Sequence, residues 1–217
     1  MALPWALAVL SLLPLLDARR LACTDYRVSI TKATLDQYSG KWYYIASAFR
    51  SPEYKLATRN IKTAFFYVTP GDTEDTVLLR EYATIGDQCL YTSRVLRIHR
   101  ENGTQLIPEN GIGHFGYLML PKDRRTFMLF AYPDDPQKTG LFFYAIKPKV
   151  TVRQKNQFYR DLRCRGMKKS DVVYGDDKKD LCKTLEKQHE EERKAKGEKT
   201  EKDTVLDKDV GDVGGLS

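Results

Sequence analysis

Few residues in this chain have the type and spacing that catalysis requires. The histidines His99, His114 and His189 stand far apart, and no His-Glu-x-x-His pattern places two of them on one helix face as zinc ligands. No glycine-flanked serine forms a nucleophile elbow. We therefore expect a binding protein rather than an enzyme, with no catalytic residue, no metal site and no cofactor.

One glycine-rich run, Gly111 to Gly116, fits the fingerprint of a dinucleotide-binding loop, and Asp134 and Asp135 follow near the spacing of the ribose-binding acid. That motif needs a helix N-terminus directly after the glycines to hold the phosphates. Residues 117–120 read Tyr-Leu-Met-Leu and continue as a strand instead. We expect the glycines to form a loop that enters a strand.

The N-terminus predicts secretion. The apolar run Ala2 to Leu16 has 15 residues, fewer than the roughly 18 that a membrane-spanning helix needs. Such a run is typical of a signal peptide, and the small residue Ala18 follows it at a plausible cleavage point. We expect residues 1–18 to be removed and the mature chain to be extracellular.

An oxidising compartment changes the chemistry of the four cysteines, Cys23, Cys89, Cys164 and Cys182, because it favours disulfide formation. Their spacing alone does not choose among the three possible connectivities. If all four pair, no thiolate nucleophile remains. In a secreted chain we also expect glycosylation at Asn102, which begins an Asn-Gly-Thr acceptor triplet.

The elements that must position these residues are mainly strands. Short aromatic and β-branched runs alternate with turn residues such as those at 70–72, 85–87 and 121–123, which is typical of an antiparallel meander. Closure into a barrel would remove the exposed edge strands. We expect seven or eight strands, over residues 41–49, 61–69, 76–83, 89–99, 104–107, 113–120, 126–131 and 140–147.

The chain after the strands changes character twice. Residues 150–164 lose turn residues and place Val152, Lys155, Tyr159 and Leu162 at helical spacing, so we expect one amphipathic helix on the barrel wall. From residue 183 onward 18 of 35 residues are charged and aromatics are absent. We expect one domain over 19–182 and a charged tail over 183–217 that is disordered or a fraying helix.

The stretch from Leu35 to Arg50, which contains Gly40-Lys41-Trp42, resembles the lipocalin family. The resemblance covers roughly residues 1–193. It implies an all-β fold, an eight-stranded up-and-down antiparallel lipocalin barrel with one C-terminal α-helix packed alongside. It also implies the disulfides Cys23–Cys164 and Cys89–Cys182. Further matching segments are 73–76, 79–82, 100–104, 169–174 and 185–190.

A barrel of this kind has a cavity, and the resemblance matches Tyr44, Glu81, His114 and Tyr144 to positions that line it. Phe142 shares a strand face with Tyr144. For both tyrosines, core packing is the alternative. For Glu81, the alternatives are a partnered carboxylate inside the cavity and a solvated one at the rim beside Arg80.

Alternation places further residues on shared strand faces. We expect Trp42 to close the barrel floor and Val77 and Leu79 to share the face of Glu81. In the first strand, alternation puts Trp42, Tyr44, Ala46 and Ala48 on one face. A cavity of this composition suits small lipophilic or amphipathic molecules, drug-like or steroid-like.

The resemblance implies a monomeric plasma transport protein with an acute-phase, immune-modulating role. The charge distribution raises an alternative. Residues 147–169 hold nine Lys or Arg against the single Asp161, within a chain of net charge +7. Such a segment predicts either a solvated helix face or an anion-binding surface for glycosaminoglycan or acidic membrane. Nucleic acid is disfavoured because no recognition motif accompanies the charge.

Overall fold

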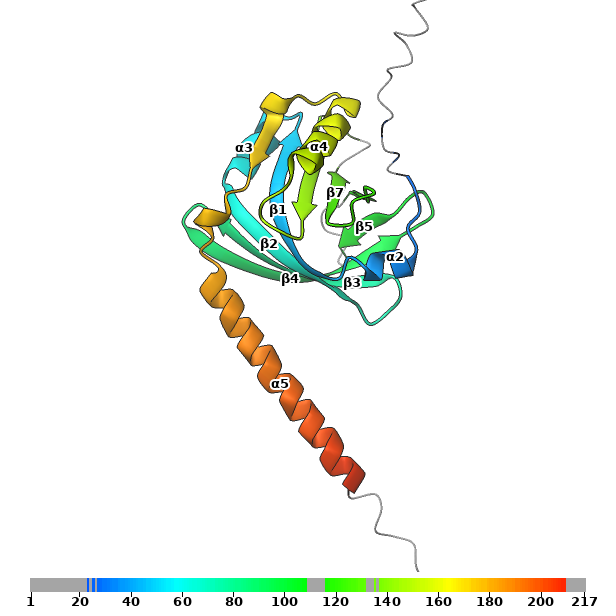
Figure 1. The fold of residues 1–217 in the computed structure, drawn as a ribbon, viewed down its shortest axis with the longest axis vertical. Coiled ribbons are helices and arrows are strands. Elements are labelled where there is room, and N and C mark those ends of the chain that lie inside the picture. The colour runs from blue at the N-terminus through cyan, green and yellow to red at the C-terminus, as the bar shows by residue number, and fades with distance from the viewer. Residues whose placement is uncertain are drawn as a thin grey trace, which may run out of the picture.

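The computed structural model describes a β-barrel with helices packed outside it (Figure 1). The description covers residues 23, 25, 27–108, 116–131, 135 and 137–209, without the side chains of 198–209. The expected signal peptide, residues 1–18, lies outside it. The strands are β1 (Gly40–Phe49), β2 (Ile61–Pro70), β3 (Thr76–Ile85), β4 (Gln88–His99), β5 (Gln105–Pro108), β6 (Tyr117–Met119), β7 (Thr126–Ala131), β8 (Gly140–Ala145) and β9 (Val172–Tyr174).

Strands β1 to β8 pair antiparallel with their neighbours along the chain, and β1 pairs with both β8 and β2, which closes the barrel. The predicted eight-stranded lipocalin barrel is therefore confirmed. Gly40 begins β1 with a positive φ of 118°, a conformation that favours glycine over other residues. The short strand β9, which the sequence analysis missed, pairs with β1 over Ala46 to Ala48.

Strand β1 contains a bulge that the simple alternation of its side chains did not reveal. Its register with β8 shifts between Tyr44 and Ala46. Trp42 and Tyr44 lie in interior clusters, whereas Ala46 and Ala48 pack in the outer cluster with helix α4. The expectation that all four residues share one face is wrong, because a bulge inserts one residue and reverses the alternation beyond it.

The helices are α2 (Lys32–Asp36), α3 (Pro52–Arg59), α4 (Val152–Cys164) and α5 (Lys183–Asp209), with 3-10 turns at Lys169–Asp171 and Asp177–Lys179. Helix α4 is the predicted amphipathic helix. Thr151 and Gln154 form a capping box at its start, which satisfies backbone donors of the first turn. No helix in the described ranges is both long and apolar enough to cross a lipid bilayer.

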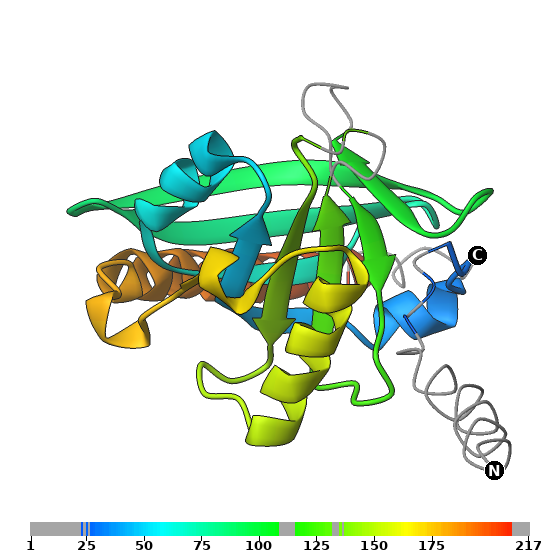
Figure 2. The ribbon, with the colours of Figure 1, turned by 90° about the horizontal axis from the view of Figure 1, so that it is seen from above.

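Helix α4 lies along the outside of the barrel (Figure 2). Phe158 and Leu162 are buried against β1, β6, β7 and β8, and Phe158 stacks on Phe143 at 5.0 Å between ring centroids. Val152, which we expected on the packed face, is 76% exposed. The packed face instead carries the buried residues Gln154, Phe158, Asp161 and Leu162. Gln154 donates to Asp123 in the loop between β6 and β7, and Asp161 accepts from Gln157 of the same helix.

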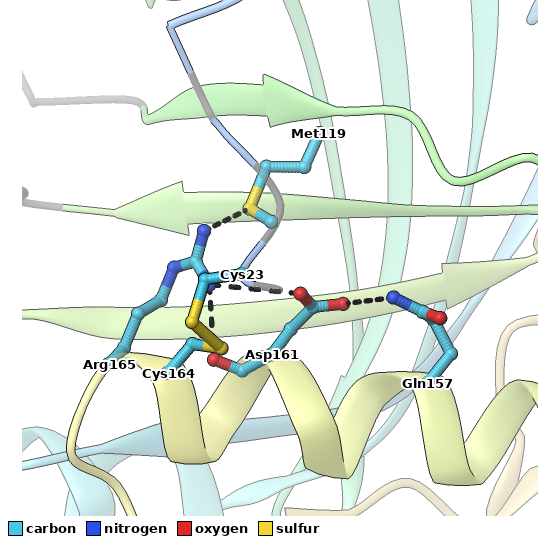
Figure 3. Close-up of a disulfide and its surroundings, with 6 residues drawn as sticks. All are labelled: Cys23, Met119, Gln157, Asp161, Cys164 and Arg165. Carbon is cyan, nitrogen blue, oxygen red and sulfur yellow. Dashed lines mark hydrogen bonds and ion pairs between the residues drawn. A yellow bond between two sulfur atoms is a disulfide. The ribbon is translucent and has the colours of Figure 1, made fainter. Parts of the chain in front are cut away.

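Both expected disulfides are present: Cys23–Cys164 joins the N-terminal segment to the end of α4, and Cys89–Cys182 joins β4 to the segment before α5. Each restricts the unfolded chain across a long loop, which stabilises a fold by typically about 2–4 kcal/mol. Figure 3 shows Arg165 beside the first disulfide, where it reaches from the end of α4 to Met119.

Of the two states expected for the tail, the structure has a helix, α5, which projects away from the barrel (Figure 1). Its first turns pack on the outer face of the sheet. The Tyr67 hydroxyl donates to Glu186 at 2.6 Å and to Glu190 at 2.9 Å, and the Tyr82 hydroxyl hydrogen-bonds His189 Nδ1 at 2.9 Å. These side-chain contacts compensate for the small apolar surface of the segment.

Candidate ligand-binding cavity

The barrel contains a cavity that opens to solvent, and the space not filled by atoms there, open solvent included, is about 720 Å³. Strands β2 to β8 supply most of the wall, and Leu35 of α2 and the nearby Tyr38 cover part of it. The wall is almost wholly apolar. Its residues are Leu35, Tyr38, Phe66, Val68, Val77, Leu79, Glu81, Leu96, Leu106, Leu118, Phe127, Leu129 and Tyr144.

Tyr144 places a hydroxyl in this apolar wall. Its ring stacks on Phe127 at 4.9 Å and meets Phe66 edge-on at 5.0 Å between centroids. Burial raises the pKa of Tyr144 well above its ordinary value, and the nearby charge of Glu81 adds to that shift. Within the described part of the chain no group hydrogen-bonds the hydroxyl. A ligand in the cavity can therefore supply its partner.

Glu81 is the one carboxylate of the cavity wall within the described ranges, and it is paired. Arg94 Nη2 of β4 lies 2.9 Å from Glu81 Oε2, and the side chains are 38% and 33% exposed. Of the two alternatives weighed for Glu81, the structure has a partnered carboxylate in the cavity wall. Its partner is Arg94 and not the neighbouring Arg80.

Tyr44 and Phe142 lie inside the barrel behind Tyr144 and do not line the cavity. The Tyr44 ring is 6.3 Å and the Phe142 ring 6.2 Å from that of Tyr144, within the range of aromatic pairs. The Tyr44 hydroxyl hydrogen-bonds Ser47 Oγ at 2.8 Å. Burial raises the pKa of Tyr44 to about 12. These two residues support the cavity wall from behind.

Trp42 is buried below the cavity, as expected of a residue that closes the barrel floor. Its indole nitrogen donates to the Tyr38 carbonyl at 2.7 Å, and its ring stacks on the Tyr38 ring at 5.5 Å between centroids. Tyr38 and Phe127 separate it from the cavity space. The floor is therefore a packed aromatic layer.

The remaining site predictions fall elsewhere. His114 and most of the glycine-rich run lie outside the described residues. Asn102 is exposed in the turn between β4 and β5, where a glycan has room. In the described ranges no group of three or more His, Cys, Asp or Glu side chains is arranged to hold a metal ion.

Sequence reasoning missed Arg94, although a signal for it exists. Gly86, with a positive φ of 59°, turns β3 into β4 so that Ile85 pairs with Gln88. Counting back from that turn pairs Leu79 with Arg94. Residues directly opposite in an antiparallel pair share a face. The two-residue turn therefore predicts that Arg94 shares the inner face with Leu79.

Comparison with known proteins agrees with this geometry. Residues 39–179 match the model of the lipocalin / cytosolic fatty-acid binding protein family. Alpha-1-acid glycoprotein of Bos taurus is 50% identical over 200 residues, covering 91% of this chain and 99% of the relative. The Oryctolagus cuniculus protein of the same name is 52% identical over 196 residues, covering 89% and 97%.

Among solved structures, the siderocalin Ex-FABP superposes with a TM-score of 0.55 at 16% identity, over 64% of this chain and 93% of that one. A likeness at that identity concerns the barrel fold alone. The family match and the half-identical relatives go further, because they span most of the sequence. The chain belongs to the lipocalin family, and these half-identical relatives are alpha-1-acid glycoproteins.

Proposed function

We propose that this chain is a secreted transport protein that carries small hydrophobic or amphipathic molecules, drug-like or steroid-like, in its barrel cavity. Membership of the lipocalin family supports ligand binding rather than turnover. The observation that carries the proposal is an apolar cavity whose wall includes Tyr144, a side chain with one hydroxyl group. Sites that bind small lipophilic molecules typically have such a composition, an apolar wall with a small number of polar groups.

Apolar contact supplies most of the affinity in this proposal. Burial of apolar ligand surface contributes about 25 cal/mol per Å² removed from water, before the costs of association are subtracted. The Tyr144 hydroxyl orients a polar group of the ligand, and the Glu81–Arg94 pair stands where solvent reaches the wall. His114 stays a proposed ligand-binding residue, whereas Tyr44 and Phe142 act in this proposal through Tyr144, against whose ring they pack.

The compartment and the wider role are part of the proposal. Two disulfides suit an oxidising environment outside the cell. We infer that residues 1–18 are removed, that Asn102 is glycosylated, and that residues 19–182 form a monomeric barrel domain followed by the charged segment 183–217. A plasma transport role with acute-phase immune modulation is also part of the proposal, and the half-identical alpha-1-acid glycoprotein relatives support it.

Expression of the full chain in mammalian cells tests the compartment. The expected product is in the medium, begins after residue 18, and loses mass when peptide-N-glycosidase F removes its glycan. An Asn102→Gln variant should be unaffected by that enzyme. Retention of an uncleaved chain inside the cell would contradict secretion.

A ligand panel tests carriage directly. Trp42 is the single tryptophan that remains after removal of residues 1–18, so the tryptophan emission reports on the barrel floor alone. We expect saturable changes in Trp42 fluorescence with steroid-like and drug-like lipophiles at one ligand per chain. If cationic, neutral and anionic lipophiles all fail to bind, the carrier proposal is wrong.

A second candidate, an anion-binding surface over residues 147–169, is favoured by one observation. Asp161, the single acid of the segment, is buried against the barrel, while Arg153, Arg160 and Arg163 are exposed on α4. The outward side of the segment therefore presents cations. Arg165 does not add to it, because it is buried with its guanidinium 4.6 Å from the centre of the Phe130 ring.

Heparin affinity chromatography tests this surface. Binding through α4 predicts elution above physiological ionic strength and earlier elution of the triple variant Arg153→Gln, Arg160→Gln, Arg163→Gln. A control with the same charge change on α5, Lys187→Gln with Arg193→Gln and Lys194→Gln, should elute close to the wild type. Elution of the wild type at or below physiological salt would remove this candidate.

A further inference from the structure

Arg94 belongs to the inner face of the barrel. Its Cα is paired with that of Leu79, and Leu79 lines the cavity. Leu96, two residues further along β4, also lines the cavity. Because residues two apart on a strand point to the same side, Arg94 and Leu96 share the inner face. The guanidinium is thus a feature of the ligand-binding side of the sheet.

The Arg94 guanidinium is fixed on Glu81 by a small polar network. Arg94 Nη2 contacts Glu81 Oε2 at 2.9 Å and Thr92 Oγ1 at 3.2 Å. The Thr92 hydroxyl in turn donates to Glu81 Oε2 at 3.5 Å. Thr92 is directly opposite Glu81 in the strand register, so the network follows from the backbone pairing of β3 and β4.

The pair leaves the cavity wall without net charge in the described part of the chain. Glu81 is one-third exposed and sits in the wall, and Arg94 supplies the opposite charge beside it. The other wall residues are uncharged. The opposing effects of the two groups reach Tyr144, because the charge of Glu81 raises the pKa of that hydroxyl and the charge of Arg94 lowers it.

We infer that Arg94 sets the charge selectivity of the cavity: by pairing with Glu81 it makes uncharged amphipathic molecules the preferred ligands over cationic ones. This inference rests on the proposed carrier function and names its ligand class. An ammonium group entering the cavity would have to share Glu81 with a guanidinium of the same charge. A carboxylate would meet Glu81 itself.

An uncharged ligand neither competes with Arg94 for Glu81 nor is repelled by the Glu81 carboxylate. It keeps the Glu81–Arg94 pair intact, buries its chain against the apolar wall and hydrogen-bonds the Tyr144 hydroxyl with its polar end. Arg94 is in this sense a specificity-determining residue rather than a source of affinity.

Three probes with the same ten-carbon chain separate charge from apolar contact: decanol, decylammonium and decanoate. Isothermal titration of each into the mature chain at pH 7.4 measures the three affinities. We expect the wild type to bind decanol more tightly than decylammonium. In Arg94→Gln, decylammonium should gain about fivefold or more, since Glu81 is then unpaired, while decanol should change less than about twofold.

A second variant tests the same pair from the other side. Glu81→Gln removes the carboxylate that repels an anionic ligand, so decanoate should gain about fivefold while decylammonium does not. In the double variant Glu81→Gln, Arg94→Gln, the decylammonium gain seen with Arg94→Gln alone should disappear. Arg97→Gln removes the same charge from the opposite face of β4 and should leave all three affinities near the wild-type values.

The outcomes distinguish this inference from the carrier function. Decanol binding with equal decylammonium affinity in wild type and Arg94→Gln would overturn the role of Arg94 and leave the carrier function standing. Tighter wild-type binding of decylammonium than of decanol would also overturn it. Failure of all three probes with every variant that retains the wild-type circular dichroism would overturn the carrier function, and this inference with it.

Discussion

The indole of Trp42 meets the ring of Phe127 edge-on, with centroids 4.7 Å apart and planes at 72°. Phe127 lines the cavity, whereas Trp42 is 2% exposed and does not. The tryptophan is therefore one aromatic ring away from a bound ligand and shielded from water by the barrel floor. Quenching of Trp42 by a solute in water can therefore be distinguished from a change in its emission caused by a ligand in the cavity.

We predict that acrylamide in solution leaves Trp42 emission of the folded mature chain nearly unchanged, because the quencher must touch the indole. A lipophile in the cavity should change the emission through displacement of Phe127. Stern–Volmer plots in buffer and in concentrated urea provide the comparison. Equal acrylamide quenching in both solvents would show that Trp42 is not buried as described.

The buried Tyr44 hydroxyl predicts a loss of stability in alkali. Its pKa is about 12 in the folded chain against an ordinary value of 10.0. The folded state therefore holds its proton more tightly, so the stabilisation is complete below pH 10 and is lost as the pH rises to about 12. Two pKa units correspond to about 3 kcal/mol.

Urea unfolding from pH 7 to 12 tests this. Tyr44→Phe should cost about 1 kcal/mol at pH 7 through loss of the hydrogen bond to Ser47, but should lose less stability than the wild type above pH 10. Ser47→Ala, which keeps the titrating group, should retain the alkaline loss. Parallel pH profiles for wild type and Tyr44→Phe would contradict the prediction.

The strand positions could be predicted because the signals for them are local. Alternating apolar residues and turn residues such as Gly86 mark strands within a few residues of one another. The bulge in β1 could not be predicted in this way, because it is a register shift in the pairing of β1 with β8, a strand far away in the sequence. The wrong assignment of Ala46 and Ala48 has this cause.

The packed face of α4 shows a second limit. Apolar spacing predicted Val152 on the packed face, but the structure buries Gln154, whose partner Asp123 is distant in sequence, and Asp161, whose partners lie four residues away on either side. Gln154 Nε2 donates to Asp123 at 2.9 Å, and Asp161 is bonded by Gln157 and lies near Arg165. A prediction from hydropathy alone does not identify such residues, because the burial of a polar side chain depends on its hydrogen-bond partners.

The cavity was predictable only in part. Val77, Leu79 and Glu81 were placed correctly on one face by alternation, and all three line the cavity. Leu35 and Phe127, which also line it, come from segments far apart in sequence, so only the closed barrel brings them together.

The buried pair of Asp161 and Arg165 predicts that removing one charge costs more stability than replacing both. Arg165 Nη1 donates to the Asp161 carbonyl at 3.0 Å and lies 3.9 Å from its carboxylate, with both side chains almost fully buried. Removing one charge takes this opposite charge away from a buried ion, and breaking a buried pair in this way typically costs about 3 kcal/mol or more. We expect Asp161→Asn to lower the free energy of unfolding by about that amount.

Replacing both charges by apolar residues should cost less than the single change, because no uncompensated charge then remains. Urea unfolding of Asp161→Asn and of the double variant Asp161→Leu, Arg165→Met provides the comparison. A double variant that is less stable than Asp161→Asn would argue that the pair itself is the main source of stability.

Docking of α5 predicts a local effect of Tyr67→Phe. The substitution removes the hydroxyl that donates to Glu186 and Glu190, so hydrogen exchange of residues 183–190 should accelerate about tenfold or more. Ligand affinity should not change, because the Tyr67 contacts lie outside the cavity. Glu191→Gln, at an exposed position of α5, is the matched control and should exchange like the wild type.

Titration of the uncharged fluorescent lipophile N-phenyl-1-naphthylamine into the mature chain, beside a variant in which Leu79→Trp fills the cavity, tests carriage most directly. The predicted result is saturable binding at one molecule per wild-type chain and a loss of at least about tenfold in affinity for the variant, with its circular dichroism unchanged. Equal affinity for both proteins would place the ligand outside the barrel and contradict the account.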